Sequence, residues 1–130
     1  MNNSFEIMED KKSVLIIDDD SRNIFALSLY LKARGFQSIS ALSAKEGIEI
    51  LNKSHNIAVV FMDMMMPEMD GYEAIGKIRE IPRFSSLPII AVTAQAMTGD
   101  KEKCLDAGAS GYISKPINMD KLIAMINGLI

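Results

Sequence analysis

Short apolar runs alternate along the chain with segments of helical spacing. Residues 14–17, 57–62 and 89–92 are continuous runs of apolar, often β-branched residues. Such runs are typical of strands that are buried on both faces of a parallel sheet. The alternating segment 36–40 and the short segment 111–114 bring the number of predicted strands to five.

A helical pattern follows each predicted strand. Ile24, Leu27 and Leu31 share one face of a helix that starts at Ser21, and Gly35 is a natural stop for it. The remaining helices are predicted at residues 44–53, behind the capping box of Ser43 and Glu46, at 72–81, at 99–107, and from the cap Asn118 to the last residue.

This strict alternation predicts an α/β domain, in which helices cover both faces of a five-stranded parallel sheet. A closed eight-stranded barrel would need about 250 residues, and the chain has 130. We therefore expect one doubly wound domain over residues 13–130, preceded by a polar lead-in over residues 1–12.

Composition and charge narrow the classes of function. The chain is 48% hydrophobic and 24% charged, with a net charge of −3 and scattered Lys and Arg, so we expect no direct nucleic-acid binding. The single Cys104 allows no internal disulfide and suits a reducing compartment. The polar, acidic N-terminus does not resemble a signal peptide, and no apolar run approaches the roughly 20 residues of a membrane span. A cytoplasmic location is expected, without membrane association.

Polar residues follow four of the five predicted strands directly. In open α/β sheets, ligands bind beyond the carboxyl ends of the strands, so these side chains are expected to meet at one edge. They are Asp18, Asp19, Asp20, Asp63, Thr93 and Lys115.

These residue types form one coherent set of chemical groups. Clustered carboxylates repel one another unless they bind protons or a cation, and oxygen ligands favour Mg²⁺, Mn²⁺ or Ca²⁺. Lys115 supplies a compact positive charge and Thr93 a hydroxyl. A carboxylate nucleophile, a divalent cation, an ammonium and a hydroxyl are the parts needed for phosphoryl transfer to an aspartate.

The residues in these segments closely resemble the receiver domains of two-component response regulators. The resemblance runs from Lys12 to Ile130. It rests on the acidic pair after the first strand (residues 14–19), the pattern D-x-x-M-P-x-M-D-G (63–71), the hydroxyl motif (91–94) and the lysine motif (111–116). It implies a flavodoxin-like (βα)5 fold with strand order 2-1-3-4-5.

The resemblance also implies the reaction. Asp63 would accept a phosphoryl group from a phosphohistidine, carried by a histidine kinase or a histidine phosphotransfer protein. Mg²⁺, or Mn²⁺ as a substitute, would be bound by Asp18, Asp19, Asp63 and the backbone carbonyl of Met65. Beyond its own phosphorylation and slow dephosphorylation, the domain would act as a signalling module and not as an enzyme.

Further roles follow from the same resemblance. Thr93 and Lys115 would bind the phosphoryl oxygens, helped by backbone N–H groups near Met64 and Ala94. Tyr112 would be an aromatic switch whose rotamer follows Thr93. The Lys115–Pro116 bond would be cis. The surface around the fourth helix, fifth strand and fifth helix would signal to a downstream protein, and Gln95 and Met65 would influence the phosphoryl lifetime.

Simpler interpretations exist for several residues. Asp20 alone suffices to cap the first helix, and Tyr112 on a short strand is open to a role in packing. His55 is predicted to be solvated in a polar loop, and Cys104 to be an ordinary helix residue.

A methionine-rich segment resembles a soft-metal site, but apolar packing explains it better. Its members are Met62, Met64, Met65, Met66 and Met69.

Three rival functions fit the sequence less well. A haloacid dehalogenase-type phosphatase needs a second aspartate two residues after Asp63, where Met65 stands. A flavodoxin-like electron carrier needs Ser, Thr and Gly after the first strand, where Asp18 to Asp20 would repel a flavin phosphate. A degenerate receiver would lack some of the acidic, threonine or lysine positions. Whether the domain is stand-alone or belongs to a hybrid kinase or larger regulator stays open.

Overall fold

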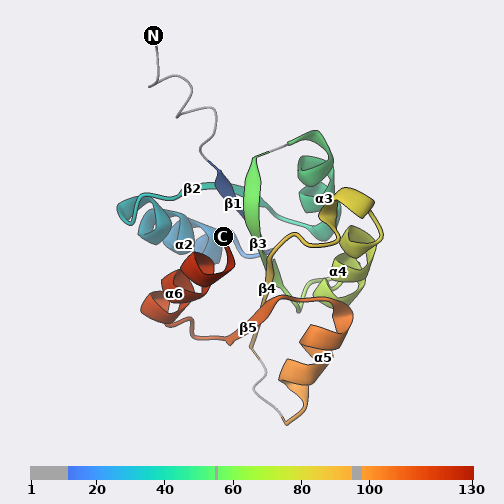
Figure 1. Cartoon of the computed structure of the whole chain (residues 1–130). Helices are drawn as coiled ribbons and strands as arrows, with labels where there is room; N and C mark the ends of the chain where they lie inside the picture. The colour runs from blue at the N-terminus through green and yellow to red at the C-terminus, as the bar shows by residue number, and fades with distance from the viewer. Residues whose placement is uncertain (1–11, 55, 95–97) are drawn as a thin grey trace.

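The computed structural model describes residues 12–54, 56–94 and 98–130. Its centre is a five-stranded sheet in which each neighbouring pair is parallel, with the order β2-β1-β3-β4-β5 (Figure 1). The strands are β1 (Ser13–Ile17), β2 (Gln37–Ala41), β3 (Ile57–Asp63), β4 (Ile89–Thr93) and β5 (Gly111–Ser114). The predicted fold class and strand order are confirmed.

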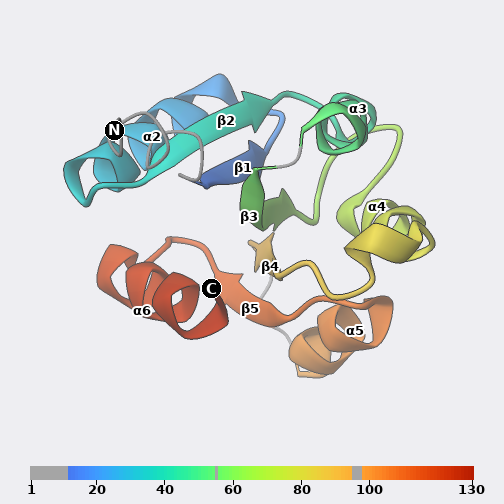
Figure 2. The same cartoon turned by 45° about the horizontal axis from the view of Figure 1, so that its top comes forward.

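Helices cover both faces of the sheet, as the alternating pattern predicts (Figure 2). The helices are α2 (Ser21–Ala33), α3 (Ala44–Lys53), α4 (Gly71–Arg79), α5 (Asp100–Ala107) and α6 (Met119–Leu129), with a 3-10 turn η1 (Pro82–Phe84). Helices α2 and α6 pack on one face, and α3, α4 and α5 on the other. Right-handed crossovers between parallel strands produce this two-sided arrangement.

The apolar strands divide their side chains between two cores. In β1, Leu15 and Ile17 join the core under α3, α4 and α5, whereas Val14 and Ile16 join the core under α2 and α6. All five residues of β1 and all five of β4 are buried. Alternate side chains of a strand point to opposite faces, so a continuous apolar run is what a sheet covered on both sides requires.

Predicted helix caps are present in the structure. The Ser43 hydroxyl accepts a hydrogen bond from the Glu46 N–H (3.1 Å), and the Glu46 carboxylate accepts one from the Leu42 N–H (2.8 Å). Asn118 Oδ1 accepts a hydrogen bond from the Lys121 N–H (3.0 Å). These bonds satisfy N–H groups that a helix leaves unpaired in its first turn.

Two boundaries differ from the sequence prediction. Strand β2 lies one residue later than predicted, and of its five residues only Ala41 is buried. The alternation over residues 36–40 therefore does not predict which side chains of β2 are buried, because neighbouring elements cover an edge strand less than a central strand. Helix α4 ends at Arg79, two residues before the predicted end at Ile81. Pro82 disfavours helical backbone at the preceding residue, and the chain enters η1 there.

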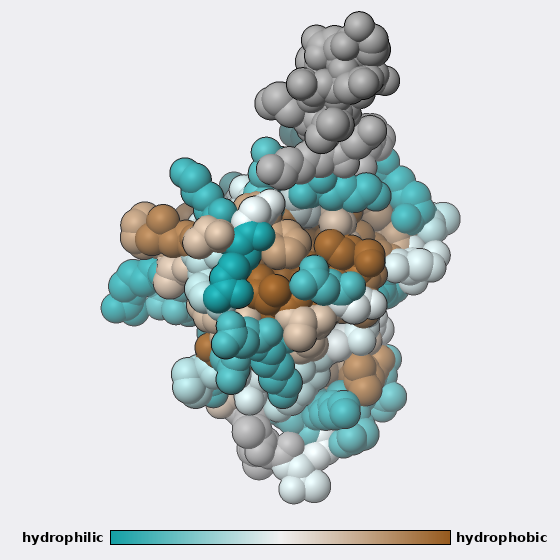
Figure 3. Space-filling view, turned by 60° about the vertical axis from the view of Figure 1, so that its left-hand side comes forward, coloured by the Kyte–Doolittle hydropathy of each residue, from teal (hydrophilic) through white to brown (hydrophobic). Residues whose placement is uncertain are grey.

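A few large apolar side chains remain exposed on the surface. Phe25 and Leu29 are 66% and 54% exposed on the outer side of α2. Figure 3 shows apolar side chains gathered among hydrophilic ones on the side of the molecule where α2 and α6 lie. Over the described residues, no helix combines the length and the hydropathy needed to cross a bilayer.

Candidate functional site

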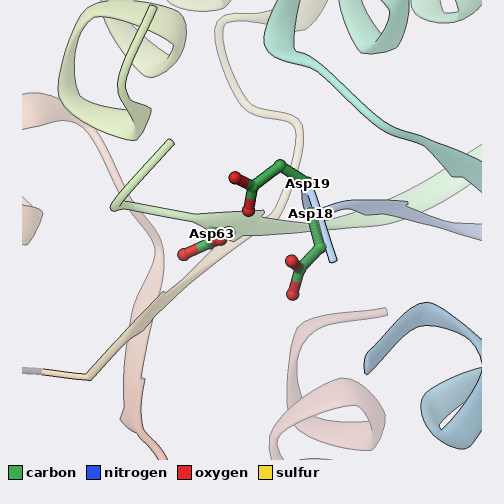
Figure 4. A group of neighbouring side chains, drawn as sticks. All are labelled: Asp18, Asp19 and Asp63. Carbon is green, nitrogen blue, oxygen red and sulfur yellow. The ribbon is translucent and has the colours of Figure 1, made fainter. Parts of the chain in front are cut away.

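The carboxyl ends of β1, β3, β4 and β5 bring the predicted polar residues to one edge of the sheet. Asp18 follows β1, Asp63 and Thr93 end β3 and β4, and Lys115 follows β5. Asp18 and Asp63 are each only 4% exposed, and Thr93 is 1% exposed. Figure 4 shows the side chains of Asp18, Asp19 and Asp63 gathered at the ends of β1 and β3.

The three aspartates after β1 have separate local roles. Asp18 Oδ1 accepts a hydrogen bond from the Asp20 N–H (2.8 Å), and Asp18 Oδ2 accepts one from Asn23 Nδ2 (3.3 Å). Asp20 caps α2, where its carboxylate accepts hydrogen bonds from the backbone and guanidinium of Arg22. Asp19 is exposed. The expectation that Asp20 serves as the cap agrees with these contacts, which leave Asp18 and Asp19 for the site.

The loop after β3 holds Asp63 in place. The Met64 N–H donates to the Val92 carbonyl (3.0 Å), and the Met65 N–H donates to Asp63 Oδ1 (3.1 Å). Gly71 packs so closely on this loop that an added Cβ would lie 2.7 Å from the Met64 Cα. A side chain at position 71 would therefore displace the loop that carries Asp63.

The ammonium group of Lys115 lies close to the two buried carboxylates. Its backbone N–H donates to the Thr93 carbonyl (2.7 Å), which fixes the end of β5 against the end of β4. Lys115 Nζ lies 3.8 Å from Asp63 Oδ1 and 4.0 Å from Asp18 Oδ2. The Lys115–Pro116 peptide bond is cis, as the resemblance implies. The ammonium is thus near both carboxylates at a distance too long for strong hydrogen bonds.

The buried position of Asp63 changes its acidity. Burial raises the pKa of Asp63 to about 6, and the negative charges of Asp18 and Asp19 add to this rise. The hydrogen bond from the Met65 N–H and the charge of Lys115 lower the pKa, but they do not offset the burial. An ionised Asp63 therefore lacks compensating positive charge, and a bound cation would supply it.

The acidic cluster fits a divalent metal ion. Carboxylate oxygens of Asp18, Asp19 and Asp63 all lie within 4.8 Å of one another. Oxygen ligands from two or three carboxylates suit Mg²⁺ and Mn²⁺. Burial, with a smaller contribution from the charges of Asp18 and Asp19, disfavours the ionised form of Asp63, and a bound cation would favour it. The three aspartates are therefore consistent with the magnesium site of a receiver domain. The carbonyl of Met65 stays a predicted further ligand.

Other predicted residues occupy distinct positions. Tyr112 lies on β5, is partly buried and packs against the core under α3, α4 and α5. Met65 is 52% exposed beside Asp63, whereas Met62, Met64 and Met66 are buried in the core. Burial of these three supports the packing interpretation of the methionine-rich segment.

Cys104 lies in α5, as predicted. Its side chain is fully buried, and Sγ lies 3.9 Å from the Tyr72 hydroxyl. His55 and Gln95 lie outside the described residues, as does nearly all of the lead-in over residues 1–12.

Two further polar residues, one in contact with the site and one at the start of α5, were not predicted from the sequence. Asn23 binds Asp18 from the first turns of α2, and the only signal was its position one turn after the aspartates. Asp100 is 9% exposed at the start of α5. Because it stands directly after Gly99, at a predicted helix start, it was indistinguishable from an ordinary surface residue of a first turn.

Comparison with known proteins identifies the family. A family model described as "Response regulator receiver domain" matches residues 14–127. The polar-differentiation response regulator DivK of Brucella ovis is 34% identical over 88% of this chain and 93% of its own length. Hybrid signal transduction histidine kinase I of Dictyostelium discoideum is 38% identical over 89% of this chain.

A solved structure extends the comparison to a complex. The receiver domain of Ssk1 from Saccharomyces cerevisiae, in a co-crystal with the histidine phosphotransfer signaling protein Ypd1, has a TM-score of 0.83 and 27% identity. The match covers 92% of this chain and 89% of that one.

The fold and the acidic edge define a class of signalling domains, and the chain belongs to the response regulator receiver domain family of two-component systems. Receiver domains are signalling modules and not metabolic enzymes. The chain spans 7% of the Dictyostelium kinase and no more than 56% of several other curated relatives.

Proposed function

We propose that Asp63 is the phosphoacceptor of this receiver domain and that Asp18, Asp19 and Asp63 bind Mg²⁺, with the Met65 carbonyl as a further ligand. The supporting observation is the convergence of buried Asp18, buried Asp63 and Lys115 at the ends of three strands, with Lys115 Nζ within 4.0 Å of both carboxylates. Mn²⁺ would serve as a substitute ion.

The proposed reaction is transfer of a phosphoryl group from a phosphohistidine. An oxygen of the Asp63 carboxylate attacks phosphorus, the bond from phosphorus to the imidazole nitrogen breaks, and its electron pair returns to that nitrogen. A divalent ion held by Asp18, Asp19 and Asp63 would supply positive charge that offsets the carboxylates and phosphoryl oxygens. Lys115 pairs with one phosphoryl oxygen and Thr93 donates its hydroxyl to another, while N–H groups near Met64 and Ala94 bind the rest.

The donor is proposed to be a histidine kinase or a histidine phosphotransfer protein of the kind named in the Ssk1 complex. Hydrolysis of the aspartyl phosphate would be the only turnover. Phosphorylation would shift an existing equilibrium between two conformations, with Tyr112 following Thr93. The face formed by α5, β5 and α6 would carry the signal to a downstream protein. We assign the domain to residues 13–130 and infer a cytoplasmic location from the single cysteine.

Incubation with acetyl phosphate and Mg²⁺, followed by intact mass measurement, tests this proposal. The wild-type chain is expected to gain one phosphoryl group, whereas Asp63→Asn gains none. Asp106→Asn, which removes an exposed carboxylate from α5, is the matched control and should gain the group normally. An equal adduct in wild type and Asp63→Asn, or no adduct in the wild type, would contradict the assignment.

A further inference from the structure

A buried carboxylate oxygen without a partner lies at the start of α5. Asp100 is 9% exposed, and among the buried side-chain oxygens and nitrogens of the described residues only its Oδ2 has no hydrogen-bond partner. The residue at the N-cap of α5 is Gly99, with a φ of +91°, so no side chain caps this helix. The dipole of α5 favours a negative charge at Asp100, but it does not give Oδ2 a donor.

Leaving such an oxygen unpaired costs free energy, because water that solvated the carboxylate is removed and nothing replaces it. A second conformation in which Oδ2 accepts a hydrogen bond would recover this free energy. The donors near the first turn of α5 decide which second conformation is available to Asp100.

Asp100 is close enough to two tyrosines and one thiol for its charge to influence them. The charge of Asp100 raises the pKa of Tyr112, after the larger effect of burial. Burial, the contact with Cys104 and the charge of Asp100 raise the pKa of Tyr72 to about 12. Tyr72 has other contacts, since its hydroxyl lies 3.9 Å from Cys104 Sγ and Lys103 Nζ lies 4.5 Å from the centre of its ring.

The position of Tyr112 connects Asp100 to the site. Tyr112 pairs with Ala91 across the sheet, and Ser114 pairs with Thr93, so Tyr112 and Thr93 lie one step apart along the same face. The chain that leaves Thr93 enters α5 at Asp100. A displacement of Thr93 toward Asp63 would therefore act on both Tyr112 and the first turn of α5.

We infer that Asp100 is a positioning residue for Tyr112: its buried Oδ2 accepts a hydrogen bond from the Tyr112 hydroxyl in the phosphorylated conformation, and this bond stabilises that conformation. The inference rests on the proposed function of Asp63 and adds a residue to it. It gives the unpaired oxygen a donor, and it links the start of α5 to the rotamer of Tyr112.

The test is a double-mutant cycle read at the tyrosine rings. Beryllium fluoride with Mg²⁺ serves as a stable mimic of the phosphoryl group, and a ¹³C label at Cζ of tyrosine or Cζ of phenylalanine reports the ring at position 112. Loss of a hydrogen bond to a charged group is expected to raise the beryllium fluoride concentration for half-conversion about tenfold. Asp100→Ala and Tyr112→Phe should each show this rise, and the double variant no more than either single variant.

Two further variants separate positioning from general damage to the fold. Asp100→Asn keeps an acceptor oxygen, so it should regain part of the lost response, and Asp106→Ala should match the wild type. The inference would be overturned if the increases in half-conversion concentration caused by Asp100→Ala and Tyr112→Phe multiplied in the double variant. It would also be overturned if Asp100→Ala showed this non-additivity with Tyr72→Phe instead of Tyr112→Phe. If the wild type itself does not respond to beryllium fluoride, the proposed function of the site fails as well.

Discussion

The two edges of the same sheet differ in both chemistry and shape. The edge formed by the carboxyl ends of the strands contains Asp18, Asp63 and Lys115, and a groove of about 290 Å³ lies beside Asp18 and Lys115. The opposite edge has the larger cavity, about 600 Å³, lined mainly by apolar residues such as Val59 and Leu129. The proposed site is therefore marked by its charged groups and not by the size of a cavity.

The two edges also contribute differently to stability. Burial of Val59 and its neighbours removes apolar surface from water and stabilises the fold. Burial of Asp63 places a carboxylate beside two others and raises its pKa to about 6. Burial of the Asp63 carboxylate therefore lowers the free energy of unfolding, whereas burial of apolar side chains at the opposite edge and in the two cores raises it. The following variants separate these contributions.

The largest effect on stability is expected from Asp63→Asn. The pKa of Asp63 rises from 3.8 to about 6 on folding. As the pH increases, the Asp63 carboxyl group therefore loses its proton at a lower pH in the unfolded chain than in the folded one. The free energy of unfolding therefore falls between these pH values, and the whole loss is present above pH 6. At 1.36 kcal/mol per pKa unit the loss is at most about 3 kcal/mol.

Asp63→Asn should therefore stabilise the fold by up to about 3 kcal/mol near pH 8, and by about half as much near pH 5. Urea unfolding at the two pH values measures the difference, with Asp106→Asn as the exposed control. A gain that is equal at both pH values would show that the ionisation of Asp63 is not its cause.

The next effect concerns the rate of phosphorylation. Lys115→Met removes the ammonium that lies 3.8 Å from Asp63, and loss of one charge-stabilising donor typically slows a reaction about 10²-fold. The rate of adduct formation with acetyl phosphate measures this effect. Lys121→Met, an exposed lysine on α6, should react at the wild-type rate, and a normal rate in Lys115→Met would remove Lys115 from the site.

At the apolar edge the effect should fall on stability alone. Val59→Ala removes two methyl groups from a fully buried side chain, and the expected cost is about 2 kcal/mol. Adduct formation with acetyl phosphate should proceed at an unchanged rate while the protein is folded. A large change in that rate would mean that the two edges are coupled, contrary to the comparison.

The smallest effect is predicted for a helix cap close to the functional edge. Ser43→Ala removes the hydroxyl that accepts from the Glu46 N–H and should cost about 1 kcal/mol of stability. Thermal unfolding measures the cost, and Ser43→Asp, which keeps a capping oxygen, is the control. Since Ser43 has no proposed contact with the phosphoryl group, phosphorylation by acetyl phosphate should stay normal.

Most of the fold could be predicted from the sequence because its signals are local. The apolar runs around Ile16 and Ile90, and the caps at Ser43 and Asn118, each specify an element within a few residues. The errors at 36–40 and at the end of α4 have physical causes outside these local patterns. Coverage by neighbouring elements decides which residues of an edge strand are buried, and Pro82 ends the preceding helix.

The site was predictable to the extent that strand ends converge. The positions of Asp18, Asp63 and Lys115 follow from the parallel topology, which the sequence pattern indicates. The contact between Asn23 and Asp18, the burial of Asp100 and the packing of Cys104 against Tyr72 depend on how helices lie on the sheet. No pattern within a single element contains that information.

The central claim is that the phosphoryl group is bound to Asp63, and chemical mapping tests it most directly. After incubation with acetyl phosphate and Mg²⁺, borohydride reduces an aspartyl phosphate to homoserine, and mass spectrometry of the digested chain locates it. Homoserine is expected at position 63 alone, and only when Mg²⁺ is present. Homoserine at Asp18, Asp19 or Asp20, or at no aspartate, would contradict it.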